Sequence, residues 1–323
     1  MIRFLLVSLL VVAVSASVLD HAAQFQEFKL KHGKTYKNQV EETRRFNIYK
    51  SNLESIAAHN ARYEQGLETY TLAANKFADM TRQEFSAKLA LQKATKPKLN
   101  ITRTFKMPKG VEAPASVDWR SNAVTPVKNQ GNCGSCWAFS LTGSTEGAYA
   151  LKYGNVVALS EQQLVDCTTD LNFGCDGGYL EDNFPYISKK GLQSESSYPY
   201  EGVDGKCRYD ESNVVTRVDD YVAIYEDEEA LQNAVGTVGP VSIAINADFI
   251  QFYDSGIFHM AICYIFGLNH GVLAVGYGSE NGEDYWIIKN SWGADWGENG
   301  YIRFKRGVNE CGMAEDTVYP IIN

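Results

Sequence analysis

The sequence predicts an α+β fold in which a small, mostly helical N-terminal segment precedes a helical half and then a β half. Two patterns predict it. Apolar residues recur at helical spacing over 40–63 and again after Cys136. From Val214 onward the apolar runs are short and strand-like, as in 270–277. A chain of 323 residues is long enough for a large core plus one further folded segment. We expect a cleft between the helical and β halves.

The first residues have the pattern of a secretory signal peptide. Arg3 is followed by an apolar run from Phe4 to Val14, and the small residues of 14–16 offer a cleavage site. This run is too short to cross a bilayer. We therefore expect a signal peptide at 1–16 and no membrane anchor. The protein is expected in the secretory pathway, either in the lysosome or outside the cell, including a digestive lumen.

Seven cysteines occur, all from Cys133 onward. In an oxidising compartment six of them can pair, but spacing alone does not select the pairs. The seventh thiol then needs an explanation of its own, which a catalytic cysteine supplies. A zinc site at Cys167 and Cys175 is the alternative use of these residues, but no histidine lies nearby. We expect neither a metal nor an organic cofactor.

The charge is divided unevenly along the chain. Residues 1–112 carry 18 Lys and Arg against 10 Asp and Glu, a net charge of +8, whereas residues 113–323 carry 12 against 29, a net charge of −17. This asymmetry suggests that the N-terminal part docks on the C-terminal part. The alternative is that the asymmetry is incidental. A nucleic-acid partner is not expected, because such a partner requires a basic footprint.

The N-terminal part contains three predicted helices. A short helix ends near Gly33, a long helix spans Val40 to Tyr63, and Thr81 with Glu84 forms a capping box that opens a third helix to about Leu91. A strand-like piece lies at 69–72. Six residues of the long helix fall at steps of three or four and share one face: Glu41, Arg45, Tyr49, Asn52, Ile56 and Asn60. Residues 93–112 have no periodicity and are expected to form an extended connector that exposes the sequon at Asn100 for glycosylation.

The run from Cys133 to Trp137 carries the predicted nucleophile. Cys136 comes directly after a glycine-bearing turn and begins a helical pattern, so its sulfur is expected at a helix N-terminus. The positive end of the helix dipole favours the thiolate, which is the nucleophilic form. Gln130 can offer a side-chain N–H to an oxyanion beside the backbone N–H of Cys136. The alternative is a structural cysteine on a core helix.

A predicted hairpin supplies a base for this nucleophile. The strands 270–277 and 285–290 are joined at Asn281-Gly282, a strong hairpin signal. Folding the hairpin brings His270 and Asn290 to the same end of a sheet. His270 is then the expected general base and Asn290 the residue that orients its ring. His259, the only other histidine beyond residue 112, is expected to be partly packed or exposed.

These motifs resemble the papain family of cysteine peptidases, and most closely its cathepsin L branch, from about Gln24 to Asn323. The run around Cys136 matches the Cys-Gly-Ser/Ala-Cys-Trp/Tyr pattern of the family. The face of the long helix resembles the Glu-Arg-Phe-Asn-Ile-Asn signature of its propeptides, with Tyr49 in place of Phe. Residues 73–79 resemble the Gly-x-Asn-x-Phe-x-Asp propeptide motif, with Ala73 in place of glycine. If that position has a positive φ, alanine is unfavourable there.

The resemblance implies an inhibitory propeptide at 17–112 and a two-lobed papain-like peptidase domain at 113–323, with a helical lobe, a β-barrel-like lobe and a cleft between them. It implies a resting thiolate–imidazolium pair between Cys136 and His270. The implied disulfides are Cys133–Cys175, Cys167–Cys207 and Cys263–Cys311. The residues expected to bind substrate are Gly134, Gly177, Gly178, Tyr179, Leu180, Ala244, Leu268, Asn269, Gly271, Trp292 and Asp316. For Gly177 and Gly178 a simple turn is the alternative.

The resemblance also implies how the protein works. We expect a monomeric endopeptidase that cleaves proteins and peptides, because the chain lacks the histidine pair of the cathepsin B-type exopeptidases. Asp316 is expected at the base of a specificity pocket that accepts apolar side chains and Arg; the alternative is that it faces solvent. Acid is expected to trigger removal of the propeptide, with Asp79 as one candidate sensor. Cystatin-type inhibitors are further expected partners.

Two other functions remain open at this point. The chain is alternatively a catalytically silent, disulfide-stapled binding or storage protein with the same fold. The N-terminal part alternatively acts in trans as a peptidase inhibitor after its release.

Overall fold

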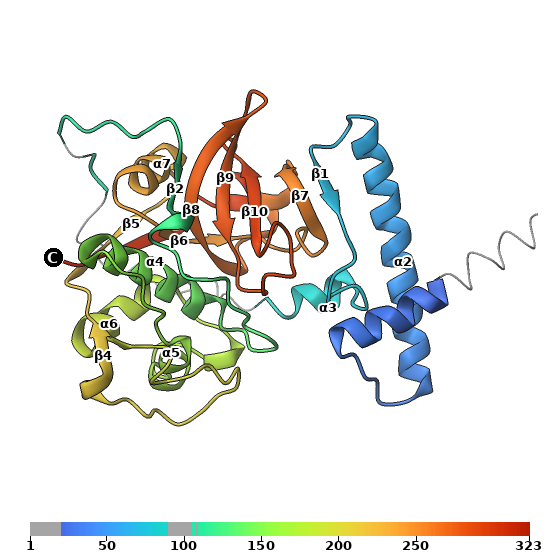
Figure 1. The fold of residues 1–323 in the computed structure, drawn as a ribbon, viewed down its shortest axis with the longest axis horizontal. Coiled ribbons are helices and arrows are strands. Elements are labelled where there is room, and N and C mark those ends of the chain that lie inside the picture. Colours follow the sequence, from blue (N-terminus) through green and yellow to red (C-terminus); the bar gives the residue numbers. More distant parts are fainter. Residues whose placement is uncertain (1–20, 90–104, 108) are drawn as a thin grey trace, which may run out of the picture.

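The computed structural model describes residues 21–89, 105–107 and 109–323, so the predicted signal peptide and the sequon at Asn100 lie outside the described residues. Figure 1 shows an N-terminal helical part beside a larger C-terminal part, in which helices lie on one side and a sheet on the other. This arrangement confirms the predicted α+β class. Among the described residues, no helix combines the length and the apolar character that crossing a bilayer requires.

The N-terminal part has three helices and one strand. They are a helix over residues 21–32, α2 (Gln39–Glu64), β1 (Tyr70–Leu72) and α3 (Arg82–Ser86). The Thr81–Glu84 capping box is present as predicted. The third helix is shorter than predicted, because the amides of Lys88 and Leu89 bond to carbonyls only three residues back and close a turn.

One face of α2 holds the rest of the N-terminal part together, as the predicted six-residue pattern requires. Tyr49 is buried with Phe25, Phe28 and Ala78 in a small aromatic core. The side-chain amide of Asn52 donates to the carbonyls of Ala78 and Met80 at 2.8 and 3.0 Å. The signature is therefore a set of contacts that fixes the chain following α2.

The helical lobe is organised around α4 (Cys136–Tyr153), with α5 (Glu161–Cys167), α6 (Phe184–Lys190) and the two-stranded sheet of β3 (Leu192–Gln193) and β4 (Val214–Thr216). Gly154 ends α4 at a φ of 78°. Within α4, Gly143 and Gly147 leave no room for a Cβ beside Leu273 and Pro240. These small residues let α4 pack directly against the β lobe.

A nine-stranded sheet forms the β lobe, in the order β1-β7-β10-β9-β8-β6-β11-β5, with β2 paired to β8. Only the β7–β10 pair is parallel. The further strands are β2 (Val117–Asp118), β5 (Asp220–Ile224), β6 (Val241–Ile245), β7 (Tyr253–Phe258), β8 (His270–Glu280), β9 (Glu283–Lys289), β10 (Tyr301–Lys305) and β11 (Thr317–Ile321). Strand β1 comes from the N-terminal part and joins the sheet beside β7 (Figure 1).

Two features of the β lobe differ from the expected order of a helical half followed by a β half. Helix α7 (Glu228–Thr237) lies within the β half, where the side chain of Asp227 caps it and Leu231, Ala234 and Val235 are buried. Strand β2 precedes the helical lobe in sequence but pairs with β8. After residue 112 the chain therefore starts in the β lobe, crosses to the helical lobe and returns.

The β8–β9 hairpin forms as predicted. Glu280 pairs with Glu283 across the turn, and Asn281 and Gly282 have φ angles of 53° and 83°. Both central residues thus take the left-handed conformation that a two-residue turn of this kind needs. The hairpin places the start of β8 and the end of β9 at one edge of the lobe, facing α4.

Candidate active site

Cys136 lies at the first position of α4 and its side chain is completely buried. It is the one cysteine of the described residues outside a disulfide, because the other six form the three pairs that the resemblance implied. The preceding Ser135 makes no side-chain cap to the helix. Helix α4 therefore begins without a side-chain cap, and the sulfur of Cys136 lies at its N-terminal end.

His270 and Asn290 meet at the end of the hairpin. The imidazole Nε2 lies 2.8 Å from the side-chain oxygen of Asn290. The backbone N–H of Ser291 also donates to that oxygen at 2.8 Å, which fixes the amide so that its oxygen faces the ring. Nε2 consequently carries the proton, and Nδ1 is the nitrogen available for chemistry. Nδ1 is buried and has no hydrogen-bond partner in the described structure.

The two lobes touch where these residues meet. An added Cβ at Gly271 would lie 3.1 Å from the carbonyl oxygen of Cys136 and 3.3 Å from the Cα of Trp137. The residue after His270 therefore packs against the backbone at the start of α4. A larger residue at 271 would need its neighbours to shift by a few tenths of an ångström, so glycine favours this close approach of the two lobes beside Cys136 and His270.

Gln130 is held next to this contact. Its side-chain oxygen accepts from the Ser291 hydroxyl at 2.6 Å, and its amide nitrogen donates to the carbonyl of Cys133 at 3.0 Å. Gly134 is fixed through a 2.7 Å bond from its N–H to the carbonyl of Cys175. One side-chain N–H of Gln130 therefore bonds within the protein, and the second N–H could donate a hydrogen bond to an oxyanion.

The ring of His270 is stacked on Trp292, with ring centroids 4.7 Å apart. Burial lowers the pKa of His270 to about 4, although the hydrogen bond to Asn290 opposes this shift. The imidazole is therefore neutral in this structure. Burial disfavours a charged imidazole, and the resting ion pair with Cys136 stays a prediction.

The N-terminal part covers the site. Phe77 and Phe85 stand edge-on to Trp292 at 5.4 and 5.3 Å, and Lys76 bonds to the carbonyl of Trp292 and to Asp295. These residues bury the same indole ring that stacks on His270. The predicted docking is thus observed, and aromatic packing contributes to it. The attraction between the opposite net charges of the two parts stays a prediction. Among the described residues, Lys76–Asp295 is the ion pair that joins the two parts.

The expected pocket residues converge on one side of this contact. Leu180 and Ala244 belong to one buried cluster, and Leu268 packs against it. The N–H of Ala244 donates to the carbonyl of Asp316 at 2.9 Å, so Asp316 lies beside this cluster and is half-buried. Asn269 is tied to Ala247 and Asp248 by its side-chain amide. The direction of the Asp316 carboxylate stays a prediction.

Local structure alone requires glycine at two of the expected pocket positions. Gly177 has a φ of 119°, which favours glycine. A Cβ on Gly178 would lie 2.7 Å from the indole of Trp137. Tyr179 follows, and its N–H donates to the side chain of Asn172 at 2.9 Å. A simple turn is therefore enough to explain why glycine occurs at both positions.

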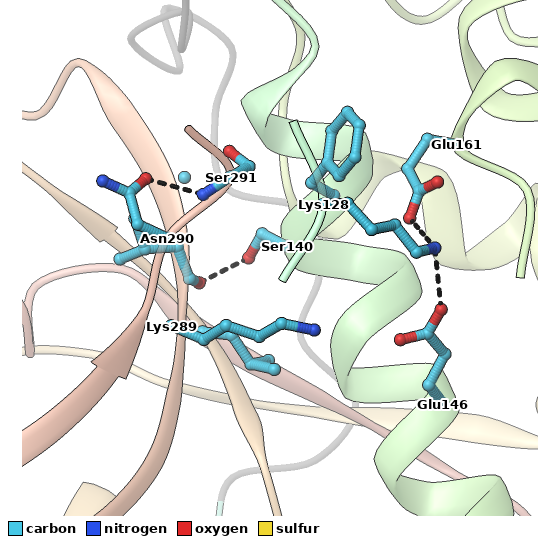
Figure 2. Close-up of a pocket in the computed structure, with 11 residues that line it drawn as sticks. Lys128, Ser140, Glu146, Glu161, Lys289, Asn290 and Ser291 are labelled. Atoms are coloured by element: carbon cyan, nitrogen blue, oxygen red, sulfur yellow. Dashed lines mark hydrogen bonds and ion pairs between the residues drawn. The ribbon is translucent and has the colours of Figure 1, made fainter. Parts of the chain in front are cut away.

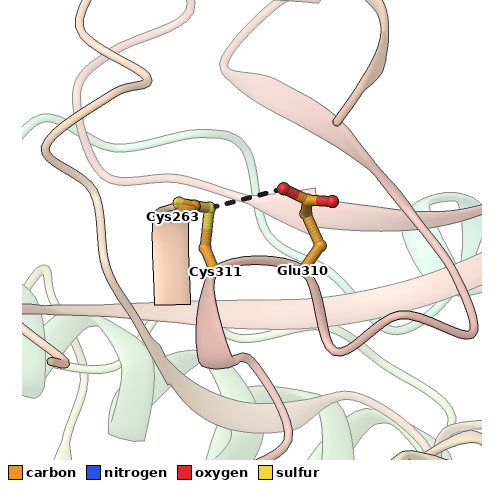
Figure 3. A group of neighbouring side chains, drawn as sticks. All are labelled: Cys263, Glu310 and Cys311. Atoms are coloured by element: carbon orange, nitrogen blue, oxygen red, sulfur yellow. Dashed lines mark hydrogen bonds between the residues drawn. A yellow bond between two sulfur atoms is a disulfide. The ribbon is translucent and has the colours of Figure 1, made fainter. Parts of the chain in front are cut away.

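The second histidine lies away from the site, as predicted. His259 is about one-third exposed and its Nδ1 is 2.7 Å from the carboxylate of Glu310. Figure 3 shows that carboxylate close to Cys263 and Cys311, whose sulfurs are bonded to each other. A disulfide offers no thiolate to a metal ion, and the Glu310 oxygens are already engaged by His259 and Met260. This cluster is therefore part of the loop structure.

A buried group of charged side chains lies behind the site and was not predicted from the sequence. Lys128 lies between Glu146 on α4 and Glu161 on α5, at 3.0 and 2.6 Å, and Lys289 on β9 points toward the same group (Figure 2). The side chain of Thr125 completes the group. Glu146 and Lys289 interrupt the apolar patterns of α4 and β9, and these interruptions could have indicated the buried group.

Comparison with known proteins agrees with this geometry. The sequence profile of papain family cysteine proteases matches residues 113–321, and that of the cathepsin propeptide inhibitor domain matches residues 25–85. A cathepsin L-like proteinase of Phaedon cochleariae is 45% identical over 322 residues, covering 97% of this chain and 99% of the relative. Procathepsin L of Rattus norvegicus is 45% identical over 311 residues, covering 93% and 92%.

A solved structure extends the comparison. Digestive procathepsin L 3 from the larval midgut of Tenebrio molitor superposes with a TM-score of 0.88 at 48% identity, covering 94% of this chain and 99% of that one. The chain belongs to the papain family of cysteine proteases. Within that family it is a cathepsin L-like zymogen, whose N-terminal part is the propeptide inhibitor domain.

Proposed function

We propose that the mature enzyme is an endopeptidase with Cys136 as its nucleophile and His270 as its general acid and base. Asn290 orients the ring of His270, and Gln130 supplies an oxyanion donor. One observation carries the proposal: the N-terminus of α4 at Cys136 packs against Gly271, next to a histidine whose Nε2 is hydrogen-bonded to Asn290. This leaves Nδ1 as the nitrogen on which a proton can be held or released.

The first half of the reaction forms a thioester. The Cys136 thiolate attacks the peptide carbonyl carbon, and the C–S bond forms as the carbonyl oxygen takes the negative charge. That oxygen accepts hydrogen bonds from the backbone N–H of Cys136 and the side-chain N–H of Gln130. His270 then donates its Nδ1 proton to the leaving nitrogen as the C–N bond breaks.

The second half regenerates the enzyme. Nδ1 takes a proton from water, and the resulting hydroxide attacks the thioester carbonyl. The C–S bond breaks, the acid product leaves, and the thiolate returns with a protonated His270. The bond from Nε2 to Asn290 keeps the same tautomer throughout. The shielding of that bond by Trp292, which is 4% exposed, supports this role for the tryptophan.

The propeptide is proposed to keep the enzyme latent and to fail in acid. Its own helices are joined by ion pairs, including Lys34–Asp79 at 2.9 Å and Arg45–Glu84 at 2.9 Å. Its contact with the peptidase is mainly apolar and backbone-mediated, as in the pairing of β1 with β7. Protonation of Glu84, which would remove its pairing with Arg45, would therefore loosen the propeptide itself. This assigns the acid trigger to the propeptide fold rather than to its docking surface.

Specificity is proposed to depend on Asp316, with apolar side chains and Arg both accepted two residues before the cut. The bond from Ala244 to Asp316 supports a position at the pocket. A second acid lies nearby, because the Tyr225 hydroxyl donates to Glu181, and the pKa of Tyr225 is raised by burial, by that bond and by the charges of Glu181 and Asp316. A cationic substrate side chain would find two carboxylates at this end of the pocket.

The remaining assignments are proposed from the resemblance. The signal peptide spans 1–16, the propeptide 17–112 and the peptidase 113–323, with a glycan at Asn100. The enzyme works as a monomer in the lysosome or outside the cell, where cystatin-type inhibitors would block it. The larval midgut source of the Tenebrio molitor relative supports a digestive lumen.

The test uses zymogen purified and then acidified with a reductant. Hydrolysis is measured on two peptides that differ only in Phe or Arg two residues before the cut, with wild type, Cys136→Ala and Asp316→Ala. We expect no turnover by Cys136→Ala, and a specific loss of Arg turnover in Asp316→Ala. Appreciable turnover by Cys136→Ala would refute the nucleophile. Failure of a thiol-directed epoxide to label wild-type Cys136 would favour the silent binding protein.

A further inference from the structure

The buried charges behind the site connect both lobes. Lys128 bonds to Glu146 on α4 and Glu161 on α5, and Thr142 on α4 also donates to Glu161 at 2.5 Å. These contacts lie within the helical lobe and the segment of chain that precedes it. Lys289, the last residue of β9, enters the same group from the β lobe (Figure 2).

Thr125 is the joint between the two sides. Its hydroxyl accepts a hydrogen bond from the Lys289 ammonium at 3.0 Å and donates its own proton to Glu146 at 2.6 Å. Both hydrogen-bonding roles of one hydroxyl are thus used, and the joint is itself buried, with 3% of Thr125 exposed. A path of side chains therefore runs from β9 through Thr125 to the helix that begins at Cys136.

The charges of Glu146, Lys128 and Lys289 strengthen the contacts along this path. Burial alone would raise the pKa of Glu146, but the charges of Lys128 and Lys289 and the bond from Thr125 outweigh it and lower that pKa. Glu146 is therefore an anion, which attracts the Lys289 ammonium through Thr125. In a low-dielectric interior such contacts are strong and directional. Lys289 is in turn covalently joined to Asn290.

We propose that Thr125 and Lys289 are positioning residues, which hold Asn290 and the His270 ring at a fixed place relative to the Cys136 end of α4. This inference rests on the proposed roles of Cys136, His270 and Asn290. Neither Thr125 nor Lys289 touches the reacting atoms. Their function is to set the distance between groups that come from different lobes.

A second link limits the expected effect. Ser291 also bridges the lobes, since its hydroxyl donates to Gln130 and its carbonyl accepts from the Gln130 backbone. Loss of the Thr125 joint should therefore displace Asn290 slightly rather than release it. Small misplacements of catalytic groups reduce kcat far more than they reduce substrate binding.

The experiment compares three matched variants of the matured enzyme. Thr125→Val keeps the shape and removes the hydroxyl, Thr125→Ser restores a hydroxyl, and Thr142→Val removes a hydroxyl from the same charge group on its helical-lobe side. For each, kcat, KM, Tm and the pH profile of Cys136 alkylation by iodoacetamide are measured. Alkylation reports the thiolate and its coupling to His270 without requiring peptide turnover.

We expect Thr125→Val to lower kcat about tenfold with KM changed less than about twofold, and to shift the alkylation profile to higher pH. Thr125→Ser should retain kcat and the wild-type profile. Thr142→Val should lower Tm without moving the profile or kcat. An equal loss of kcat in Thr125→Val and Thr142→Val, or a loss of Tm alone in Thr125→Val, would overturn the positioning role.

Lys289→Arg is the second variant, should Thr125→Val not fold. It keeps the cation but changes its shape and reach, and we expect a several-fold loss of kcat with the same shift of the alkylation profile. An unchanged kcat and profile in folded Lys289→Arg would overturn the proposal. Wild-type enzyme that neither cleaves peptide nor is alkylated at Cys136 would instead refute the proposed function on which this inference rests.

Discussion

The propeptide and the peptidase are held together in opposite ways. The propeptide keeps its helices together with partly exposed ion pairs around a core of four buried residues, Phe25, Phe28, Tyr49 and Ala78. Each lobe of the peptidase has a larger apolar core and at least one disulfide. The peptidase also buries charged side chains, among them the group where its lobes meet. Because ion pairs hold the propeptide together, whereas apolar cores and disulfides hold the peptidase together, acid should destabilise the propeptide more than the peptidase.

The largest expected effect comes from Phe85, which is 1% exposed and packs on Phe77 and Trp292. In a Cys136→Ala zymogen, which cannot process itself, Phe85→Ala should weaken the docked propeptide by about 3–5 kcal/mol, because a buried ring is lost. Calorimetry and limited proteolysis would follow the two parts separately. Leu67→Ala, at a site that is 65% exposed, is the control. A matching loss in the peptidase transition would contradict the separation of the two parts.

Acid should have the next largest destabilising effect, and this effect should fall on the propeptide. Burial raises the pKa of Glu84, but hydrogen bonds from Thr81 and Arg45 outweigh it, so that pKa lies below its usual value of 4.5. Its stabilising contribution is therefore present above about pH 4.5 and is lost as the pH falls through the lower folded value. Because the Arg45–Glu84 pair is partly exposed to solvent, the loss should be up to about 1 kcal/mol. The free energy of unfolding of the Cys136→Ala zymogen, measured from pH 7 to 3, checks this.

Glu84→Gln provides the control for that measurement. It should already be destabilised at pH 7 and should lose less on acidification than the wild-type propeptide. Equal stability of the wild-type zymogen at pH 4 and pH 7 would rule out the acid trigger proposed here.

The peptidase should respond to pH with the opposite sign. Burial raises the pKa of Glu161 from 4.5 to about 7, although Lys128 opposes the shift. A raised folded pKa means that this group stabilises the fold below about pH 4.5 and that the benefit is lost as the pH rises through 7. Glu161→Gln, in matured enzyme inhibited at its thiol, should remove on the order of 1 kcal/mol of this pH dependence. A wild-type Tm that rises steadily from pH 5 to 8 would contradict it.

The smallest effect concerns the departure from the propeptide motif at Ala73. Ala73 is not among the described residues with a positive φ, so alanine fits its backbone without penalty. Ala73→Gly should therefore destabilise the docked propeptide by about 0.5–1 kcal/mol through added freedom of the unfolded chain. The same calorimetry measures it, and a gain in stability would show that the position favours glycine after all.

The elements that carry the site could be predicted because their signals are local. The turn at Asn281-Gly282 sets the register of the hairpin as far as Gly276 and Ile287. A bulge between Ala274 and Gly276 shifts this register before the strands bring His270 to Asn290, and the bulge could not be predicted. The glycine-bearing turn before Cys136 likewise fixes the start of α4. The six-residue face of α2 was readable because residues three and four apart on a helix share a side.

What the sequence could not supply depends on contacts between distant residues. The pairing of Lys289 with Thr125 spans 164 positions, and charged residues in isolation indicate solvent rather than an interior. The lowered pKa of His270 follows from its burial in the folded structure, which no local pattern indicates. Helix α7 was not predicted, although Asp227 caps it and Leu231 is buried on it, because it lies between strand-like segments.

The pairing of β1 with β7 leaves the mature enzyme with an open sheet edge. Strand β7 pairs with β10 at Ile257 and Phe258, whereas the strand paired with Tyr253, Ser255 and Gly256 is β1 of the propeptide. Two backbone amides of this edge are also bonded within the peptidase, because the N–H of Tyr253 donates to Ile250 and that of Gly256 donates to Glu298. Once β1 departs, only the backbone groups that β1 had paired must be hydrated or matched by another extended chain.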